Sequence, residues 1–241
     1  HSGRLHDQTL LRLVRAAAPT AFGREHGFDR LSRLRGEDLR RAYRAQVPIR
    51  EYADYAPYIV RMRDHAEPDV CWPGVILDWA QTSGTTAGDK YMPVSRELLR
   101  HNFRSSMDIF AHSARMGVDL RSLFAGQILF MGGSTDLEMN EHGLRTGDLS
   151  GIVTPLIRWP ISEVYLPGKG IALMSDWTAK IDAMARACLD ADIRAVSGMA
   201  SWSLVLFTRV LELAREQGRD VRTLRDVWPN LTLFIHGGVK Y

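Results

Sequence analysis

The stretch from Gln81 to Pro93, QTSGTTAGDKYMP, holds two glycines, three threonines, a serine and a lysine, and it directly follows an apolar run that ends at Ala80. Glycine reaches positive φ at little cost and lets a ligand approach the main chain closely, so Gly84 and Gly88 can turn successive N–H groups toward one point. The hydroxyl groups and the Lys90 ammonium add further donors. This composition indicates a loop that binds an anion with several oxygens, such as a phosphate.

An ordinary turn rich in serine, threonine and glycine between two strands is the alternative explanation of this stretch. The spacing excludes two familiar phosphate motifs, because neither GxxxxGK[ST] nor GxGxxG is present. The surroundings of the loop must therefore decide between the two explanations.

The composition is that of an ordinary soluble globular protein. The chain has 241 residues, of which 45% are hydrophobic and 24% are charged, enough for one large or two small domains. No apolar stretch approaches the roughly 20 residues that span a bilayer, and no signal peptide opens the chain. We therefore expect a cytoplasmic protein that does not bind a membrane. Cys71 and Cys188 form neither a disulfide framework nor a zinc set.

The charge pattern gives little indication of a macromolecular partner. The chain has 31 Lys and Arg against 28 Asp and Glu, and the basic excess is arginine between residues 24 and 50. Such a run is usually a solvated helical face, and it lacks the interleaved aromatic residues that stack on bases. We expect no nucleic-acid partner. Lysine is rare in the chain, which makes Lys90 in the glycine loop more notable.

Apolar strands followed by glycine loops alternate with helices along the chain. Helical spacing predicts helices over residues 5–18, 36–45, 95–117, 176–189 and 200–217. Short apolar runs predict strands over residues 75–80, 90–94, 128–131, 193–196 and 231–235. This alternation predicts an α/β fold with largely parallel sheets flanked by helices.

Four of the glycine loops, QTSGTTAG, MGGST, SGMAS and HGGV, follow predicted strands. Ligands of open α/β sheets bind outside the carboxyl ends of the strands, so we expect these loops to gather around one site. Prolines should disturb the pattern in two places. Pro48 and Pro57 are expected to interrupt the helical stretch before the phosphate loop, and the segment with Pro155, Pro160 and Pro167 is expected to hold little regular structure.

The loop and the segments around it resemble the adenylate-forming enzymes. TSGTTAGDKYMP is similar to their nucleotide-phosphate motif, most closely in the auxin-responsive promoter family of acyl acid amido synthetases and its bacterial relatives. Similar segments follow in the same order along most of the chain: TAFGREHGF, VPIREYADYAPYIVRM, MGGSTD, GDLSG, PGKGIALMSDW, SGMASWSLVLFTRV and WPNLTLFIHGG. Their order and spacing make the resemblance more specific than the loop alone.

The resemblance implies an ATP-dependent ligase that activates a carboxylic acid as an acyl-adenylate and transfers the acyl group to an amine, typically an amino acid. Mg²⁺ would neutralise the departing pyrophosphate, and the loop donors would stabilise charge on the phosphates. The residues that match the phosphate motif are Thr82, Ser83, Gly84, Thr85, Thr86, Gly88 and Lys90.

The resemblance places further residues near the substrates. Gly237 and Gly238 would approach the adenine. His101 and Met107, on the long helix after the loop, would border the acyl pocket, and Trp202 is a third candidate there, although a tryptophan at a helix start more often packs. No catalytic side chain is assigned, because the substrate carboxylate itself attacks the α-phosphate.

The resemblance also implies the N-terminal portion of a larger enzyme. We expect residues 1–74 to form a helical segment that packs on an α/β core of residues 75–241. The later nucleotide and ribose motifs of the family, and its small C-terminal domain, would lie beyond Tyr241. A fragment of this kind is expected to show weak or no adenylation by itself.

Two other functions stay open: an acyl-CoA ligase, which delivers the acyl group to a thiol, and a non-catalytic module that binds a nucleotide or an acid. No metal site is predicted from the protein side chains, because no histidine has an HxxxH or HExxH partner and carboxylates such as Asp136, Glu138 and Glu141 in a polar hairpin are usually only solvated. The sequence names neither the acid nor the amine, nor the oligomeric state.

Overall fold

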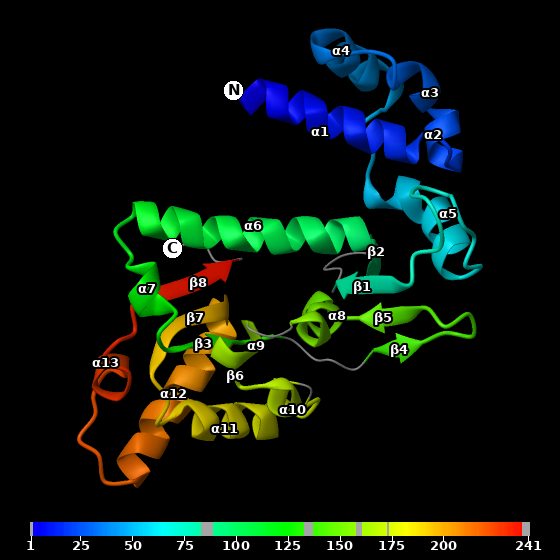
Figure 1. Cartoon of the computed structure of the whole chain (residues 1–241). Helices are drawn as coiled ribbons and strands as arrows, with labels where there is room; N and C mark the ends of the chain where they lie inside the picture. Colours follow the sequence, from blue (N-terminus) through cyan, green and yellow to red (C-terminus); the bar gives the residue numbers. More distant parts are fainter. Residues whose placement is uncertain (1, 83–88, 133–136, 158–160, 173, 238–241) are drawn as a thin grey trace. The chain divides into compact units, whose positions relative to one another are not determined.

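The computed structural model describes residues 2–82, 89–132, 137–157, 161–172 and 174–237 (Figure 1). The chain divides into two compact units. Unit 1 holds residues 1–96 and 138–146, and unit 2 holds residues 97–137 and 147–241. Each unit has buried apolar clusters of its own, so each is described by itself.

Unit 1 begins with three helices packed around α1 (Ser2–Ala17): α2 (Ala21–Glu25), α3 (Phe28–Leu31) and α4 (Gly36–Gln46). Their apolar faces meet in a cluster that contains Val14, Leu31 and Leu39. The next helix, α5 (Tyr52–Arg63), buries its apolar residues in a second cluster around Trp79. The helices predicted over residues 5–18 and 36–45 are confirmed, with ends that differ by a few residues.

Pro57 lies inside α5 and does not interrupt it. A capping box starts this helix, because the side chains of Glu51 and Asp54 each accept a hydrogen bond from the other residue's main-chain N–H. Pro57 lies in the middle of the helix and removes one main-chain hydrogen bond, while the buried side chains of Tyr58 and Ile59 hold this part of α5 on the core. The predicted interruption at Pro57 was therefore wrong, whereas Pro48 does lie beyond the end of α4.

A four-stranded sheet, in which the β1–β2 and β4–β5 pairs are antiparallel, completes unit 1. Its strand order is β2-β1-β5-β4, with β1 (Asp78–Thr82), β2 (Lys90–Val94), β4 (Glu138–Met139) and β5 (Arg145–Gly147). The strand predicted over residues 90–94 is confirmed. β1 pairs with β2 so that Thr82 stands opposite Lys90, which makes the segment between them the connection of a hairpin. Trp79 anchors β1, because its buried indole N–H donates to the Ile76 carbonyl over 3.0 Å.

Unit 2 contains a parallel sheet with strand order β6-β3-β7-β8. Its strands are β3 (Gln127–Phe130), β6 (Tyr165–Leu166), β7 (Ile193–Met199) and β8 (Leu233–Gly237), and all neighbouring pairs run parallel. The predicted α/β fold with a largely parallel sheet is confirmed here. β1 belongs instead to the sheet of unit 1. The expectation that ligands bind at the carboxyl ends of parallel strands therefore applies only to the glycine loops after β3, β7 and β8.

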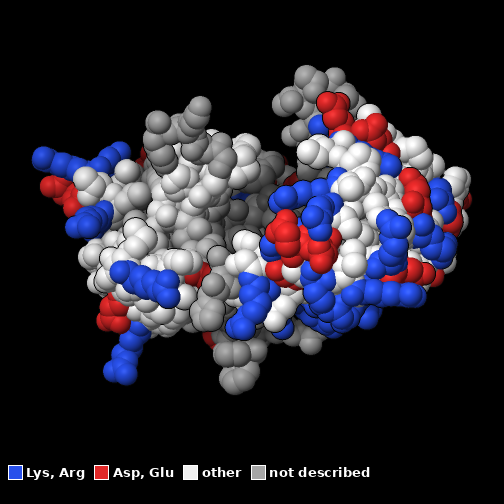
Figure 2. Space-filling model, turned by 90° about the horizontal axis from the view of Figure 1, so that it is seen from above, with Lys and Arg blue, Asp and Glu red and all other residues white. Residues whose placement is uncertain are grey.

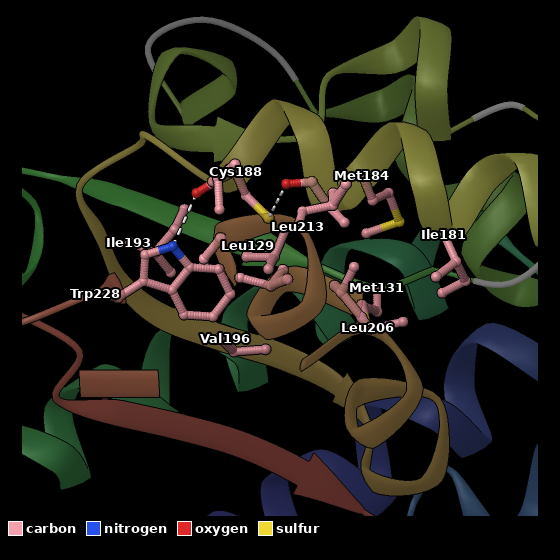
Figure 3. Packing of buried hydrophobic residues seen from close by; sticks show 14 of the residues in the cluster. Leu129, Met131, Ile181, Met184, Cys188, Ile193, Val196, Leu206, Leu213 and Trp228 are labelled. Atoms are coloured by element: carbon pink, nitrogen blue, oxygen red, sulfur yellow. Dashed lines mark hydrogen bonds between the residues drawn. The ribbon is translucent and has the colours of Figure 1, made fainter. Parts of the chain in front are cut away.

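Helices cover both faces of this parallel sheet (Figure 1). α11 (Trp177–Cys188) and α12 (Ala200–Glu216) pack on the face that carries Leu129 and Val196, and Figure 3 shows this core with the Trp228 indole donating to the Cys188 carbonyl over 2.8 Å. α6 (Arg96–Arg115) and α7 (Leu120–Leu123) pack on the face that carries Ile128 and Ala195. Successive side chains of a strand point to opposite faces of the sheet, so a short strand such as β3 contributes one residue to the core on each face.

The proline-containing segment before α11 has more regular structure than the sequence indicated. It holds α8 (Leu149–Val153), a 3-10 turn η1 (Thr154–Leu156), α9 (Ile161–Val164), the edge strand β6 and α10 (Lys169–Ala172); α13 (Leu224–Val227) precedes β8. A two-residue strand such as β6 is too short to show alternation, which explains why the prediction of little regular structure was wrong.

Gly198 lies inside β7, which extends to Met199, beyond the predicted end at Val196. The strand passes very close to Met131 at this point. A Cβ added to Gly198 would lie 2.6 Å from the Met131 Cβ and 3.2 Å from its carbonyl oxygen. Only glycine permits this approach of β7 to the end of β3 without a shift.

We expect Gly198→Ala to lower the free energy of unfolding by about 1–3 kcal/mol, because the added methyl group overpacks this contact. Urea unfolding followed by circular dichroism measures the change. Gly170→Ala is the matched control, since a Cβ on Gly170 in α10 meets nothing within 4 Å. Equal stabilities of the two variants would contradict the close approach.

Candidate functional site

Thr82 and Lys90 frame the predicted phosphate loop. They are partners in the β1–β2 register, and directly opposed residues of antiparallel strands project their side chains to the same face. A hydroxyl and an ammonium therefore lie on one side of the hairpin, where its connecting loop begins and ends. Ser83, Gly84, Thr85, Thr86 and Gly88, the other predicted phosphate ligands, lie outside the described residues.

Lys90 carries a charge that no acidic side chain of the described part of the chain neutralises within ion-pairing distance. Its Nζ atom lies 5.6 Å from the centroid of the Tyr52 ring. The neighbouring Asp89 is exposed. An ammonium over an aromatic face is attracted by the ring's negative face and keeps its donors for an anion.

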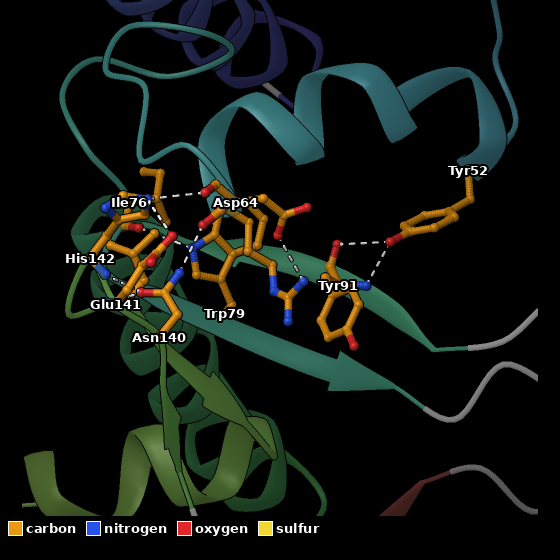
Figure 4. A network of polar contacts seen from close by, with 10 residues as sticks. Tyr52, Asp64, Ile76, Trp79, Tyr91, Asn140, Glu141 and His142 are labelled. Carbon is orange, nitrogen blue, oxygen red and sulfur yellow. Dashed lines mark hydrogen bonds and ion pairs between the residues drawn. The ribbon is translucent and has the colours of Figure 1, made fainter.

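The Tyr52 hydroxyl fixes the outer edge of β2 (Figure 4). It accepts a hydrogen bond from the Tyr91 N–H over 2.7 Å and donates to the Tyr91 carbonyl over 3.4 Å. The Arg63 guanidinium lies over the Tyr91 ring, 3.6 Å from its centroid. Because β2 is an edge strand, these contacts satisfy main-chain groups that have no partner strand.

The β4–β5 hairpin is held against the end of α5 by main-chain carbonyls (Figure 4). The Asn140 amide donates to the Arg63 carbonyl over 3.0 Å, and the His142 Nε2 atom lies 3.1 Å from the Asp64 carbonyl. The Asn140 side-chain oxygen also accepts from the Leu144 N–H over 2.9 Å and so closes the turn. His142 therefore has a structural contact within unit 1.

Metal-ligating side chains do not cluster in the part of the chain that the structure describes: it holds no group of three or more His, Cys, Asp or Glu arranged around one point. Glu138 and Glu141 are exposed on the hairpin, and Asp136 lies outside the described residues.

In unit 2, Lys180 is buried at the end of the parallel sheet, with 1% of its surface exposed. Its Nζ atom donates to the Ala172 carbonyl over 2.9 Å and lies 3.4 Å from the carbonyl of Gly132, just after β3. Burial lowers the pKa of Lys180, and the charge of Asp148 opposes this shift. The sequence reasoning missed this residue, although its position on the buried stripe of α11 was the available signal.

The three residues predicted to line the acyl pocket lie on helices of unit 2. His101 and Met107 are exposed on α6. Trp202, at the start of α12, stacks on Trp177 with ring centroids 4.3 Å apart, and the two rings line an open groove of about 930 Å³ between α11 and α12. No contact in the structure tests whether these residues bind an acid. Gly237 ends β8, and Gly238 lies outside the described residues.

Acidic and basic side chains are interspersed on the face shown in Figure 2. Two arginines of the basic run in unit 1 are ion-paired on α4: Arg40 contacts Asp7 and Glu37, and Arg41 contacts Asp38. This pairing agrees with the prediction of a solvated face. None of the helices that the structure describes combines the length and the apolar composition needed to cross a membrane.

A parallel sheet covered by helices, together with a donor-rich hairpin loop that ends at an unneutralised lysine, defines an α/β protein with a candidate anion-binding loop. Residues 1–159 match the family described as GH3 family N-terminal domain, and the chain belongs to this family.

Similar proteins within this family carry synthetase names. A protein of Oryza sativa subsp. japonica, provisionally named indole-3-acetic acid-amido synthetase GH3.10, is 30% identical over 93 residues, which cover 36% of this chain and 20% of that protein. A solved structure of AtGH3.15 acyl acid amido synthetase in complex with 2,4-DB superposes with a TM-score of 0.65 at 20% identity, over 87% of this chain and 36% of that one.

A second solved structure, described as GH3.15 acyl acid amido synthetase, gives a TM-score of 0.69 at 17% identity, over 95% of this chain and 46% of that one. At these identities the solved structures establish a shared fold. The chain spans less than half the length of each relative.

Lys180 gives the stability a specific pH dependence. Because burial lowers its folded-state pKa, the unfolded chain binds the proton more readily between the folded-state pKa and the ordinary value of about 10.4. The free energy of unfolding should then rise with pH through this window. We expect wild type to gain stability relative to Lys180→Met as the pH rises toward the ordinary lysine value of about 10.4, measured by urea unfolding.

Lys180→Gln is the control for that measurement, since it keeps a hydrogen-bond donor but cannot titrate. It should lose the pH dependence as Lys180→Met does. A constant or shrinking difference from wild type as the pH rises would show that burial does not depress this pKa.

Proposed function

We propose that this chain is the N-terminal portion of an ATP-dependent acyl acid amido synthetase, a ligase that joins a carboxylic acid to an amine such as an amino acid. The observation that carries the proposal is the hairpin loop with Thr82 opposite Lys90 in a chain of the GH3 family. The synthetase names of the rice protein and of the two solved structures support it.

The ATP phosphates are proposed to bind at the hairpin loop. An anion there meets the Lys90 ammonium, which has no acidic partner among the described residues, and the Thr82 hydroxyl on the same face. Donors fixed in place before the reaction stabilise developing negative charge without reorganisation. The proposed phosphate ligands are Thr82, Ser83, Gly84, Thr85, Thr86, Gly88 and Lys90.

The remaining sites are proposed from the family resemblance. Gly237 and Gly238 are assigned to the adenine side, and His101, Met107 and Trp202 to the acid. The exposed positions of His101 and Met107 on α6 leave them accessible to a ligand.

The proposed reaction has two steps. A carboxylate oxygen of the acid attacks the α-phosphorus of ATP, and the bond to pyrophosphate breaks. The amine nitrogen then attacks the acyl carbon, AMP leaves with the electron pair of the broken C–O bond, and the nitrogen loses a proton.

Mg²⁺ would neutralise the phosphate charge when it is bound. Magnesium is commonly held by substrate phosphates with only one or two carboxylates, so this role needs no larger acidic cluster. We assign none of the described side chains to the metal.

We also propose a cytoplasmic protein of the bacterial branch of the family. The division into a helical segment of residues 1–74 and a core of residues 75–241 stays a prediction alongside this assignment.

Lys90→Met should weaken the binding of ATP with Mg²⁺ by about tenfold or more, because it removes a charge-assisted contact to phosphate. Isothermal titration calorimetry measures the change. Arg41→Met is the matched control, because it also replaces a cation of unit 1 by methionine, on helix α4, where Arg41 pairs with Asp38. Equal affinities of the two variants would remove Lys90 from the phosphate site.

Catalysis is tested in the full-length protein by ATP–pyrophosphate exchange with a panel of carboxylic acids, and by trapping the acyl-adenylate with hydroxylamine. An amide product with an amino acid supports the synthetase. A thioester with coenzyme A would instead identify an acyl-CoA ligase, and ATP binding without pyrophosphate exchange would identify a non-catalytic module.

A further inference from the structure

A tyrosine-lined pocket of about 360 Å³ lies within unit 1, among α2, α4, α5 and β2. We call it the tyrosine pocket. The rings that line it belong to Phe22, Tyr43, Tyr52, Tyr55, Tyr58 and Tyr91. Met92 also lines it and exposes 50% of its surface, so the pocket opens to solvent there.

The size and the walls of the tyrosine pocket suit a small flat molecule. Protein interiors leave few voids larger than a water molecule, and an apolar cavity of roughly 150 Å³ already binds benzene. The tyrosine pocket is more than twice as large, which leaves room for about two fused rings. Mostly apolar pockets of this size with a few polar groups are typical of small-molecule sites.

Hydrogen bonds hold two of the tyrosine rings in place. The Tyr58 hydroxyl donates to the Glu25 carboxylate over 2.5 Å, and the Tyr52 hydroxyl bonds to the main chain of Tyr91. These side chains are already ordered in the absence of a ligand, so binding does not have to include the entropic cost of ordering them.

The charges around the tyrosine pocket favour an anion. Three cations lie near ring faces of its walls: Arg63 at 3.6 Å from the Tyr91 centroid, Lys90 at 5.6 Å from the Tyr52 centroid and Arg50 at 6.0 Å from the Tyr58 centroid. These three side chains would repel a cationic ligand. They also already lie over ring faces with which such a ligand could otherwise interact.

Of these three cations, Lys90 is the one without an acidic partner among the described residues. Arg50 pairs with Glu25 over 3.4 Å, and Arg63 pairs with Asp64 over 3.1 Å. Within the described ranges, Lys90 has no such carboxylate. An anionic group on a ring in the tyrosine pocket thus finds its complement at Lys90.

We propose that the tyrosine pocket is a binding site for a planar aromatic molecule with one anionic group, its ring among the tyrosine side chains and its anion at Lys90. This site belongs to unit 1, whereas the predicted acid-binding residues His101, Met107 and Trp202 belong to unit 2 and contribute nothing to its lining. It does not depend on the proposed synthetase activity.

Cys71 provides the readout, because its half-buried thiol lines the tyrosine pocket, whereas Cys188 is fully buried in unit 2. Burial raises the pKa of Cys71 to about 11, so alkylation by iodoacetamide is followed at about pH 9. Mass spectrometry gives the rate at Cys71 with and without a probe, and Cys188 serves as the unreactive internal reference.

Three probes share one ring system and differ in charge: 2-naphthoate, 2-naphthalenemethanol and 2-naphthylmethylammonium, each tested without ATP or Mg²⁺. We expect 2-naphthoate to slow the alkylation of Cys71 at a concentration at least roughly threefold lower than the neutral alcohol, and the cation to protect least. Lys90→Met should remove the advantage of the anion and keep the protection by the alcohol.

Met92→Trp is the blocking variant, because a larger ring at the exposed opening fills the tyrosine pocket. It should abolish protection of Cys71 by all three probes. An unchanged midpoint of thermal unfolding would show that the variant is still folded. Val47→Phe fills the same pocket from the end of α4 and is the blocking variant to use if Met92→Trp is unstable.

Protection that is absent at millimolar probe, strongest for the cation, or unaffected by the blocking variants would overturn the proposal. None of these outcomes bears on ATP binding, which is measured separately.

Discussion

The two hydrogen bonds between the Tyr52 hydroxyl, which accepts one and donates the other, and the main chain of Tyr91 are the contacts on which the candidate sites of unit 1 depend. β2 is an edge strand paired on one side only, so its outer N–H and C=O groups need another partner. One side chain at the start of α5 supplies it. The same bonds hold the Tyr52 ring next to Lys90, whose ammonium has no acidic partner within ion-pairing distance among the described residues.

A comparable constraint governs unit 2, where β7 passes so close to Met131 that Gly198 has no room for a side chain. This approach lets the parallel strands bury Leu129 and Val196 under α11 and α12. Lys180 lies at the end of that core and donates to a carbonyl of α10, so a lysine performs a structural task at the carboxyl end of β3. A buried polar group of this kind is tolerated because its donors have partners.

Periodicity and composition predicted the long helices, the parallel sheet and the place of the hairpin loop, because each depends on local pattern. The predictions of strand pairing failed where the partner strand lies far away in the sequence. β1 is joined on its other side by β5, which lies far along the chain, and β6 gains strand geometry only from β3. The regular spacing of Tyr52, Tyr55 and Tyr58 was visible in the sequence, but the pocket they line is formed only when Tyr91 and Met92 of β2 lie opposite them.

Lysine rather than arginine at position 90 matters for both candidate sites of unit 1. An arginine there would stack its planar guanidinium on Tyr52, as Arg63 does on Tyr91, whereas a compact ammonium on a flexible stem can turn between neighbouring anions. If the loop and the tyrosine pocket both bind anions, they share this one charge. Each ligand then weakens the other by the same factor, because coupling between two binding equilibria is reciprocal. The Tyr52 contact thus links the predicted phosphate loop to the tyrosine pocket through a single side chain.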